Sequence, residues 1–444
     1  MPSEQSMDYR QVADRIAADI AAGRLKPGER LPTQRRFART HGIAASTASR
    51  VYGELVRRGL VVGEVGRGTF VRAGTRLPGP VLAEPAALAV DLELNFPVLP
   101  EHADLLAESL RKQVKPAAMA DAIRAVGVAG TLAAREAAAV ALARDGWSPQ
   151  PQDVLFAGNG RQAIAGVIAA MVPPGERLGV EELTYAVVKG IAARLGVTLV
   201  PLAVDGEGVT PAALRAAGPL RAVYLQPALH NPLGVSMSAV RRAEVAEVLA
   251  DKGIPLIEDT IYGFLHDDPP LAALLPDRAV VVDSLSKRLA PGLSLGFAIA
   301  GRALRAEVAA AIRTGGWGPQ GFALAAATAW LTDGTATRLR ADKRADARAR
   351  QRLVAERLAG FDVQADSRAY HCWWRLPAHW RAETFVAAAA RSGIAITPAA
   401  AFTVATARAP HAVRLATASP PLPTLAAALD RLADIARTED LGAD

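Results

Sequence analysis

Short apolar runs alternate with helical stretches through the middle of the chain, and this alternation constrains the fold most. The runs lie at residues 177–180, 198–203, 222–226, 255–257, 279–282 and 294–300. Strands that alternate with helices favour a mainly parallel sheet wrapped by helices. Ligands of such sheets bind at the carboxyl ends of the strands, so candidate site residues should directly follow these runs.

Five sets of polar or glycine residues occupy such positions. Residues 158–162 precede a helical stretch, so their N–H groups can face an anion. A carboxylate at a buried strand end, as at Asp259, costs several kcal/mol unless a cation meets it. Any one set is more often structural than catalytic, but together and in this order they indicate a ligand site. The other sets contain Tyr185, Asn231, and Lys287 with Ser284 and Ser286; Tyr262 follows Asp259.

Residues 1–72 carry most of the positive charge of the chain. They hold thirteen Lys or Arg against seven Asp or Glu, a balance of +6 within a formal net charge of +7 for all 444 residues. A basic block at one end favours a polyanionic partner such as nucleic acid. A solvated basic surface would give the same count, so the charge alone leaves both interpretations open.

The spacing of apolar residues within this block predicts a helix-turn-helix. We expect helices over residues 11–22, 34–41 (with Thr33 as N-cap) and 45–58. The last helix of such a motif enters the major groove of DNA and presents its first residues to the bases. Here those residues include Ser46 and Thr47, with Arg50 one turn further on.

Two short apolar strands, at 60–62 and 69–71, predict a hairpin that follows the helices. Arg67 lies at its glycine-flanked tip, where it can reach a phosphate or the minor groove. Residues 73–97 are rich in Pro, Ala and Gly, which predicts an extended linker between a DNA-binding domain (1–72) and a large domain (98–444).

Residues 9–72 resemble the GntR family of winged-helix regulators. The resemblance rests on residues 23–32 (GRLKPGERLP), on Ser46, Thr47 and Arg50, and on residues 57–60 (RRGL) and 66–71 (GRGTFV). It implies that Arg35, the start of the recognition helix, Arg50 and the wing around Arg67 face double-stranded DNA. The family usually has Ser-Arg where this chain has Ala at 44 and 45, so the resemblance does not extend to the operator sequence.

Residues from about 91 to 436 resemble the fold-type I pyridoxal 5′-phosphate (PLP) enzymes of the aspartate aminotransferase superfamily. Motif by motif, the resemblance implies that Lys287 is the Schiff-base lysine and that Asp259 pairs with the pyridinium nitrogen. Asn231 and Tyr262 would hydrogen-bond the phenolic oxygen of the cofactor, and Tyr185 would stack on its ring.

The resemblance also implies how the two acidic ends of the ligands are held. Arg414 matches the arginine that grips the carboxylate of a substrate or effector. Ser294 stands where the family has an arginine, and Ala125 where a partner subunit often donates a tyrosine. Losing a charge-assisted contact costs roughly 1.5–3 kcal/mol, and Arg161, Arg288 and Arg124 are the alternatives for replacing it. The phosphate would be held by Asn159, Gly160, Arg161, Ser284 and Ser286.

A GntR domain joined to such a domain resembles the MocR subfamily of regulators over nearly the whole chain. The implied fold class is multidomain: an N-terminal α+β winged helix-turn-helix and a C-terminal α/β fold-type I PLP-dependent transferase-like domain with a small α+β subdomain. The implied function is that of a homodimeric DNA-binding transcription regulator with PLP, alone or with an amino compound, as effector. We expect slow or absent turnover.

Two alternatives stay open. The chain could be an active PLP-dependent aminotransferase with a DNA-binding appendage, because all the ring contacts are kept. It could also be a regulator whose large domain serves only as a PLP-free dimerisation scaffold, because of Ser294 and Ala125. A polar start, the lack of a long uncharged apolar run and a single cysteine, Cys372, favour a cytoplasmic protein with no membrane partner and no disulfide; no metal site is predicted.

Overall fold

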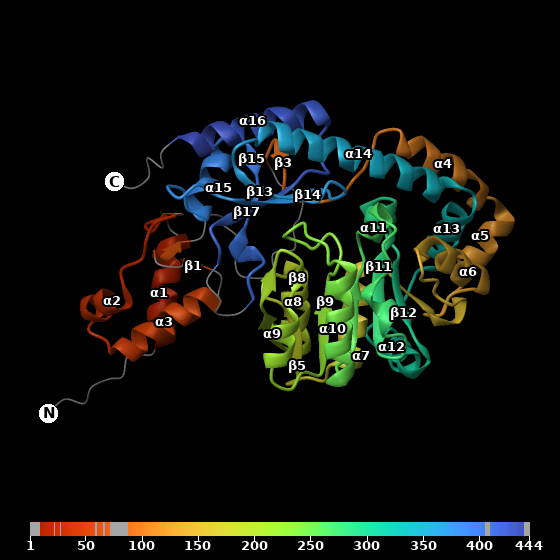
Figure 1. Ribbon diagram of the computed structural model, residues 1–444, viewed down its shortest axis with the longest axis horizontal. Helices are drawn as coiled ribbons and strands as arrows, with labels where there is room; N and C mark the ends of the chain where they lie inside the picture. Colours follow the sequence, from red (N-terminus) through yellow and green to blue (C-terminus); the bar gives the residue numbers. More distant parts are fainter. Residues whose placement is uncertain are drawn as a thin grey trace.

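A seven-stranded sheet at the centre of the large domain organises the molecule (Figure 1). The structure, a computed structural model, describes residues 9–21, 23–26, 28–57, 60–64, 67–71, 88–404 and 409–438. The sheet is parallel except for one strand that is antiparallel to both its neighbours. In spatial order the strands are β4 (Val154–Ala157), β12 (Gly296–Ala300), β11 (Ala279–Ser284), β10 (Leu256–Asp259), β9 (Ala222–Leu225), β5 (Arg177–Glu181) and β6 (Thr198–Leu202).

The alternation of apolar runs therefore predicted the sheet correctly, with two differences. The short strand β4 was not expected, and it is only four residues long. The antiparallel strand is β12. It runs back along β11 because a short helix, α11 (Leu285–Arg288), reverses the chain between them. Both differences concern the edge at which β4, β12 and β11 meet.

Helices cover both faces of this sheet, and each face has its own apolar core. One face packs against α7 (Gly160–Met171), α8 (Ala186–Leu195) and α12 (Arg302–Thr314). The other packs against α6 (Leu132–Leu142), α10 (Ala239–Asp251) and α13 (Gly321–Thr332). The remaining helices of this domain are α4 (His102–Gln113), α5 (Pro116–Ala122) and α9 (Pro211–Ala216), and a small hairpin joins β7 (Val204–Asp205) to β8 (Gly208–Val209).

A smaller domain with an antiparallel four-stranded sheet lies beside the large one. Its strands, in order, are β13 (Asp362–Gln364), β14 (His371–Arg375), β17 (Ala412–Ala416) and β16 (Thr397–Pro398). The helices α14 (Thr335–Arg357), α15 (Ala382–Arg391) and α16 (Leu422–Arg437) accompany it. Among the helices of the described residues, none combines the length and the apolar character that a bilayer span requires.

The end of the predicted linker belongs to this smaller domain. Strand β3 (Val90–Asp91) pairs with β15 (Ile394–Ala395), and Leu92 is fully buried. Residues 72–87 lie outside the described residues, so the expected linker of 73–97 is seen only in its last part. That part is folded against the small domain because its apolar residues enter the core there.

The N-terminal domain has three helices and a two-stranded hairpin. The helices are α1 (Tyr9–Ala21), α2 (Gln34–His41) and α3 (Ala45–Arg57), and the strands are β1 (Val61–Glu64) and β2 (Gly68–Val71). Thr33 accepts a hydrogen bond from the amide of Arg36, as expected of an N-cap, and Gly42 ends α2 with a φ of 61°. The apolar positions expected to face inward, among them Val12, Ile16 and Phe37, are buried together.

Candidate functional site

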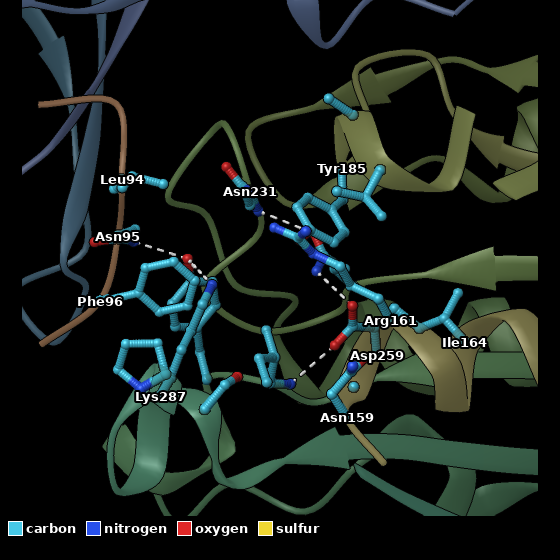
Figure 2. A pocket seen from close by; sticks show the side chains of 18 of the residues that line it. Leu94, Asn95, Phe96, Asn159, Arg161, Ile164, Tyr185, Asn231, Asp259 and Lys287 are labelled. Atoms are coloured by element: carbon cyan, nitrogen blue, oxygen red, sulfur yellow. Dashed lines mark hydrogen bonds between the residues drawn. The ribbon is translucent and has the colours of Figure 1, made fainter. Parts of the chain in front are cut away.

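A cavity of about 360 Å³ lies where the carboxyl ends of β9, β10 and β11 face the small domain (Figure 2). It brings together side chains from segments that are far apart in the sequence. Ser284 does not line the cavity itself: it lies directly behind the lining residues and is fully buried. The predicted residues that line the cavity are Asn159, Gly160, Arg161, Tyr185, Asn231, Asp259, Tyr262, Ser286, Lys287 and Arg414.

Asp259 is the last residue of β10 and presents a buried carboxylate to the cavity. Its Oδ2 accepts hydrogen bonds from the Tyr224 hydroxyl and from Gln226 Nε2 (3.1 Å), and its Oδ1 accepts one from the amide of Ile261 (2.9 Å). Burial raises the pKa of Asp259, and the bond from Tyr224 opposes that rise. Because no described cation forms an ion pair with it, this carboxylate suits a ligand that brings a positive charge.

Lys287 reaches the same cavity from the short helix α11. Its Nζ donates to the hydroxyl of Tyr262 at 2.7 Å and lies 3.9 Å from the centre of that ring. The helix is held from behind by Lys343, a fully buried side chain of α14 whose ammonium contacts the carbonyl oxygens of Lys287 (2.8 Å), Arg288 (3.1 Å) and Leu289 (2.6 Å). The position of the Lys287 amine is therefore set from both sides.

The start of α7 supplies backbone donors at one end of the cavity. Asn159 caps this helix by accepting the amide hydrogen of Gln162 at 3.0 Å. The amides of Gly160 and Arg161 have no acceptor within the helix, because first-turn amides never do. A Cβ at position 160 would lie 2.8 Å from the Cβ of Ser284, so only glycine allows this close approach.

Three serine hydroxyls converge beside these amides. Ser284 Oγ lies 3.1 Å from Ser286 Oγ and 3.2 Å from Ser294 Oγ, and it also accepts the amide hydrogen of Ser286 (3.1 Å). Ser294, whose presence in place of arginine counted against the site, thus adds a hydroxyl to the cluster and itself lines the cavity. Hydroxyls and free amides next to a helix N-terminus can bind an anionic group such as phosphate.

Of the three arginines that could replace the missing charge, the geometry favours Arg161. Arg288 is held by Asp283 through two contacts, of 2.6 Å and 3.2 Å, within the protein interior. Arg124 is exposed and does not line the cavity. Arg161 does line it, and its side chain makes no hydrogen bond or ion pair with any residue in the described part of the chain.

Arg414 lies on β17 at the opposite side of the cavity and is almost completely buried. Its Nη2 donates to the carbonyl oxygen of Glu93 and to Thr397 Oγ1 (3.0 Å), and its Nη1 lies 3.5 Å from Asn231 Oδ1. Its Nε has no partner among the described residues, and no carboxylate there forms an ion pair with it. A buried guanidinium with an open donor is suited to a ligand carboxylate.

Several cavity residues were not found from the sequence. Tyr224 on β9 and Gln226, directly after it, bind the Asp259 carboxylate. Their i, i+2 spacing, which puts both side chains on one face of an extended segment, is a signal that could have revealed them. Asn95, His371 and Lys343 had no such signal. They reach the site only through the packing of the two domains.

Four of the five predicted DNA-contacting residues are exposed or half-buried on α2 and α3, and the fifth, Arg67, differs. Arg35, Ser46 and Arg50 are exposed and Thr47 is half-buried on the same helix as Arg50. Arg50 lies 5.9 Å from the ring centre of Tyr9, which leaves its donors free to reach a base or a phosphate. This is the exposed basic surface that a recognition helix requires.

The exception is Arg67 at the wing, which contacts the small domain instead of standing free. Its Nη2 donates to the carbonyl oxygen of Ala378. Next to it the guanidinium of Arg381, at the start of α15, lies 4.3 Å from the ring centre of Phe70 on β2. The wing is therefore docked on the small domain in this conformation, beside α15 (Figure 1).

Comparison with protein families gives two matches that together span most of the chain. Residues 90–432 match the family described as aminotransferase class I and II. Residues 8–71 match the family described as bacterial regulatory proteins, gntR family. The order of the two matches is the order expected from the motifs.

Individual relatives have the same organisation. The uncharacterized HTH-type transcriptional regulator YdeF of Bacillus subtilis is 30% identical over 426 residues, which cover 93% of this chain and 90% of that protein. The vitamin B6 salvage pathway transcriptional repressor PtsJ of Salmonella typhimurium is 27% identical over 387 residues, covering 85% and 87%.

Solved structures resemble the large and small domains. The α-aminoadipate aminotransferase LysN of Thermus thermophilus, in complex with N-(5′-phosphopyridoxyl)-L-leucine, superimposes with a TM-score of 0.70 at 20% identity. The match covers 78% of this chain and 91% of that protein. At this identity the likeness establishes the fold, which is that of the fold-type I aminotransferases.

The phosphate end of the cavity yields the first prediction. Arg161→Ala should weaken PLP binding about 5- to 30-fold, because a half-buried charge-assisted contact contributes roughly 1–2 kcal/mol. The dissociation constant is measured by titrating the apoprotein with PLP and following absorbance.

Arg221→Ala, an exposed arginine at the opposite end of β9, is the matched control and should leave PLP affinity unchanged. An unchanged constant in Arg161→Ala would contradict the assignment. If Arg124→Ala weakened PLP binding instead, the charge that replaces the missing arginine would come from a second copy of the chain.

Proposed function

Since this chain belongs to the MocR family of regulators, which join a GntR-type helix-turn-helix to a PLP-binding aminotransferase class I and II domain, we propose that PLP held on Lys287 is the effector controlling its DNA binding. The single observation that carries the proposal is that one cavity holds both the Lys287 amine and a buried Asp259 carboxylate, which forms no ion pair within the described residues.

The residues of the cavity fit PLP at each of its functional groups. Asp259 offers a carboxylate to the pyridinium nitrogen, and Tyr185 offers a ring face at the start of α8. The amides at the start of α7, the serine hydroxyls and Arg161 form an anion site of the kind that phosphate needs. Asn231 and Tyr262, which also line the cavity, would donate hydrogen bonds to the phenolic oxygen.

When bound, PLP supplies an aldehyde that condenses with an amine, and Lys287 supplies that amine. The carboxylate of Asp259 keeps a pyridinium proton in place. Tyr262 holds the Lys287 amine in position through their 2.7 Å hydrogen bond. These residues are enough for reversible capture of an amino compound, which is what an amine sensor requires.

Arg414 is proposed to bind the carboxylate of such an amino compound. Its open Nε and the absence of a paired carboxylate in the described chain support this role.

A complete set of ring contacts also supports the second candidate function, an aminotransferase with a DNA-binding appendage. The hydroxyl cluster and Arg161 argue against the third interpretation, a PLP-free scaffold, because they rebuild the phosphate end.

The route from the cavity to DNA is proposed to run through the turn that follows β16. Ala401 and Phe402 of this turn line the cavity. On its other side Phe402 and Ala400 share an apolar cluster with Val62 of β1, the first wing strand. A ligand that moves this turn would therefore act on the cluster against which the wing packs, and coupling free energies of such links are typically about 1–3 kcal/mol.

A homodimer in the cytoplasm is the proposed working state. Exposed apolar side chains occur on α6 and directly after α5: Ile123 is 75% exposed, Leu132 58% and Val140 78%. Large exposed apolar groups of this kind mark protein interfaces. A second copy of the chain would also supply the second helix-turn-helix that a two-fold symmetric operator needs.

The test of the proposed function is the absorbance of the protein loaded with PLP. Wild-type protein should show a visible band that borohydride removes, and Lys287→Ala should lack it because the amine is gone. Arg414→Ala should keep the band but lose its change on addition of amino acids. Equal bands in wild type and Lys287→Ala would refute attachment at Lys287.

Binding of DNA is tested with the promoter beside the protein's own gene. Arg50→Ala should weaken binding by about 1–3 kcal/mol if Arg50 reads a base, and the affinity of the wild type should fall steeply with salt. Fluorescence anisotropy of labelled DNA measures both. Arg313→Ala on α12 removes the same charge far from the helix-turn-helix and should have little effect. Unchanged binding in an Arg35/Arg50 double variant would count against this surface.

The docked wing gives a prediction about coupling. Arg381→Ala removes the guanidinium that covers Phe70, so the wing should be released from the small domain. The ratio of DNA dissociation constants with and without PLP should then approach one, from a wild-type ratio of roughly 5- to 150-fold in either direction. Arg375→Ala, an exposed arginine on β14, should keep the wild-type ratio. A ratio preserved in Arg381→Ala would rule out this contact as the route.

A further inference from the structure

Asn95 enters the cavity from the segment that follows β3 and is buried against Tyr262. Figure 2 shows Asn95 at the edge of the cavity. Its Nδ2 donates to the Tyr262 hydroxyl at 2.7 Å and lies 3.4 Å from Nδ1 of His371. No role was expected for Asn95 or His371 from the sequence. Both belong to the small-domain side of the cavity, whereas Tyr262 follows the central strand β10 of the large domain.

The hydrogen positions in this chain of contacts follow from His371. Its ring is completely buried on β14, and burial lowers the pKa of His371 to about 3, so the ring is neutral at physiological pH. Its Nε2 lies 2.9 Å from the carbonyl oxygen of His230, which can only accept. The single ring hydrogen is therefore on Nε2, and Nδ1 carries a lone pair.

That lone pair fixes the amide of Asn95. Only the N–H side of the amide can face Nδ1, because its oxygen would place two acceptors against each other. With this orientation the two hydrogens of Nδ2 go to His371 and to Tyr262, and Oδ1 has no hydrogen-bond partner in the described chain. The tautomer of the neutral His371 ring thus fixes the orientation of the Asn95 amide.

The hydroxyl of Tyr262 is constrained in turn. Its oxygen accepts from Asn95 at 2.7 Å, so it cannot give its own hydrogen in that direction. Lys287 Nζ, also at 2.7 Å, donates from a second side. That bond belongs to the free amine, so with PLP attached at Lys287 the bond from Asn95 would be the one that remains. The hydroxyl hydrogen is left to point into the cavity, and the accepted bonds make it a stronger donor because chained hydrogen bonds polarise one another.

We propose that Asn95 and His371 are positioning residues that direct the Tyr262 hydroxyl hydrogen at the phenolic oxygen of PLP. The inference rests on the proposed function, since it needs PLP in the cavity. Donation to the phenolic oxygen stabilises its negative charge. The pH midpoint at which the bound cofactor changes its visible absorbance is therefore held lower than it would be without that donation.

The other charged groups near Tyr262 are Lys287, Arg414 and, across the cavity, Asp259. None of them changes when His371 is replaced by Phe. Because His371 is neutral, His371→Phe alters no charge between pH 5 and pH 9. It removes the Nδ1 lone pair together with the Nε2 hydrogen bond to the His230 carbonyl oxygen. Without the lone pair, the Asn95 amide is free to turn its oxygen toward Tyr262 and to draw the hydroxyl hydrogen away from the cofactor.

The experiment is a pH titration of the visible absorbance of the full-length protein loaded with PLP. We expect His371→Phe to raise the midpoint by up to about one pH unit, the size of a lost hydrogen bond. Tyr262→Phe should raise it at least as much. The double variant should match Tyr262→Phe alone, because the two changes act on the same hydroxyl. Thr417→Val, which removes a buried 2.9 Å hydrogen bond to the Tyr370 carbonyl oxygen, controls for lost stability and should leave the midpoint in place.

The outcomes distinguish a failure of the positioning role from a failure of the proposed function. An unchanged midpoint in His371→Phe, or a shift that adds to that of Tyr262→Phe, overturns the positioning role. If His371→Phe does not fold, Asn95→Leu takes its place; it should raise the midpoint by about half a unit, and a wild-type value overturns the inference. Wild-type protein without any visible band would instead overturn the proposed function and this inference with it.

Discussion

The buried carboxylate of Asp259 is the constraint on which the rest of the site depends. It stands at the end of a central strand, where burial raises its pKa, and it accepts hydrogen bonds from Tyr224 of β9 and from Gln226, the residue that follows β9. Burying a carboxylate is costly; hydrogen bonds offset part of the cost, and a positive group in the cavity would offset more of it. The cavity therefore suits a ligand with a cationic ring. Lys287, Tyr262 and the serine hydroxyls are placed to contact the other groups of such a ligand.

A second buried charge ties this arrangement to the small domain. The ammonium of Lys343 contacts three consecutive carbonyl oxygens at the end of α11, and burial lowers the pKa of Lys343 to about 7. Lys343 belongs to α14, the long helix that continues from the large domain toward the small one (Figure 1). Movement of the small domain is thus linked to the turn that carries Lys287, on the opposite side of the cavity from the turn that contacts the wing.

The features that depend on short-range sequence patterns could be predicted from the sequence, whereas the contacts that depend on tertiary packing could not. The strand runs, the Thr33 cap and the polar sets after each strand follow from short-range patterns, and all but one of the predicted ligand-binding residues line one cavity, with Ser284 directly behind it. Asn95 and His371 are separated by 276 residues and meet only because β3 joins the small domain. Ser294 was interpreted as a loss because a motif compares residue types, whereas its hydroxyl lies 3.2 Å from Ser284 Oγ in space.

The makeup of the phosphate end explains how such a site can act as a sensor. Its only unpaired arginine in the described chain, Arg161, is half-buried, and its other donors are hydroxyls and amides. Neutral donors and a partly screened charge hold a dianion less tightly than a buried arginine does. Weaker anchoring lets occupancy follow the concentration of PLP, since a ligand shifts an equilibrium only near its dissociation constant. The same cavity wall carries Phe402, which shares an apolar cluster with Val62 of the wing, and Arg67 of the wing is bonded to Ala378 of the small domain, so the proposed link from occupancy to the wing has contacts to act through.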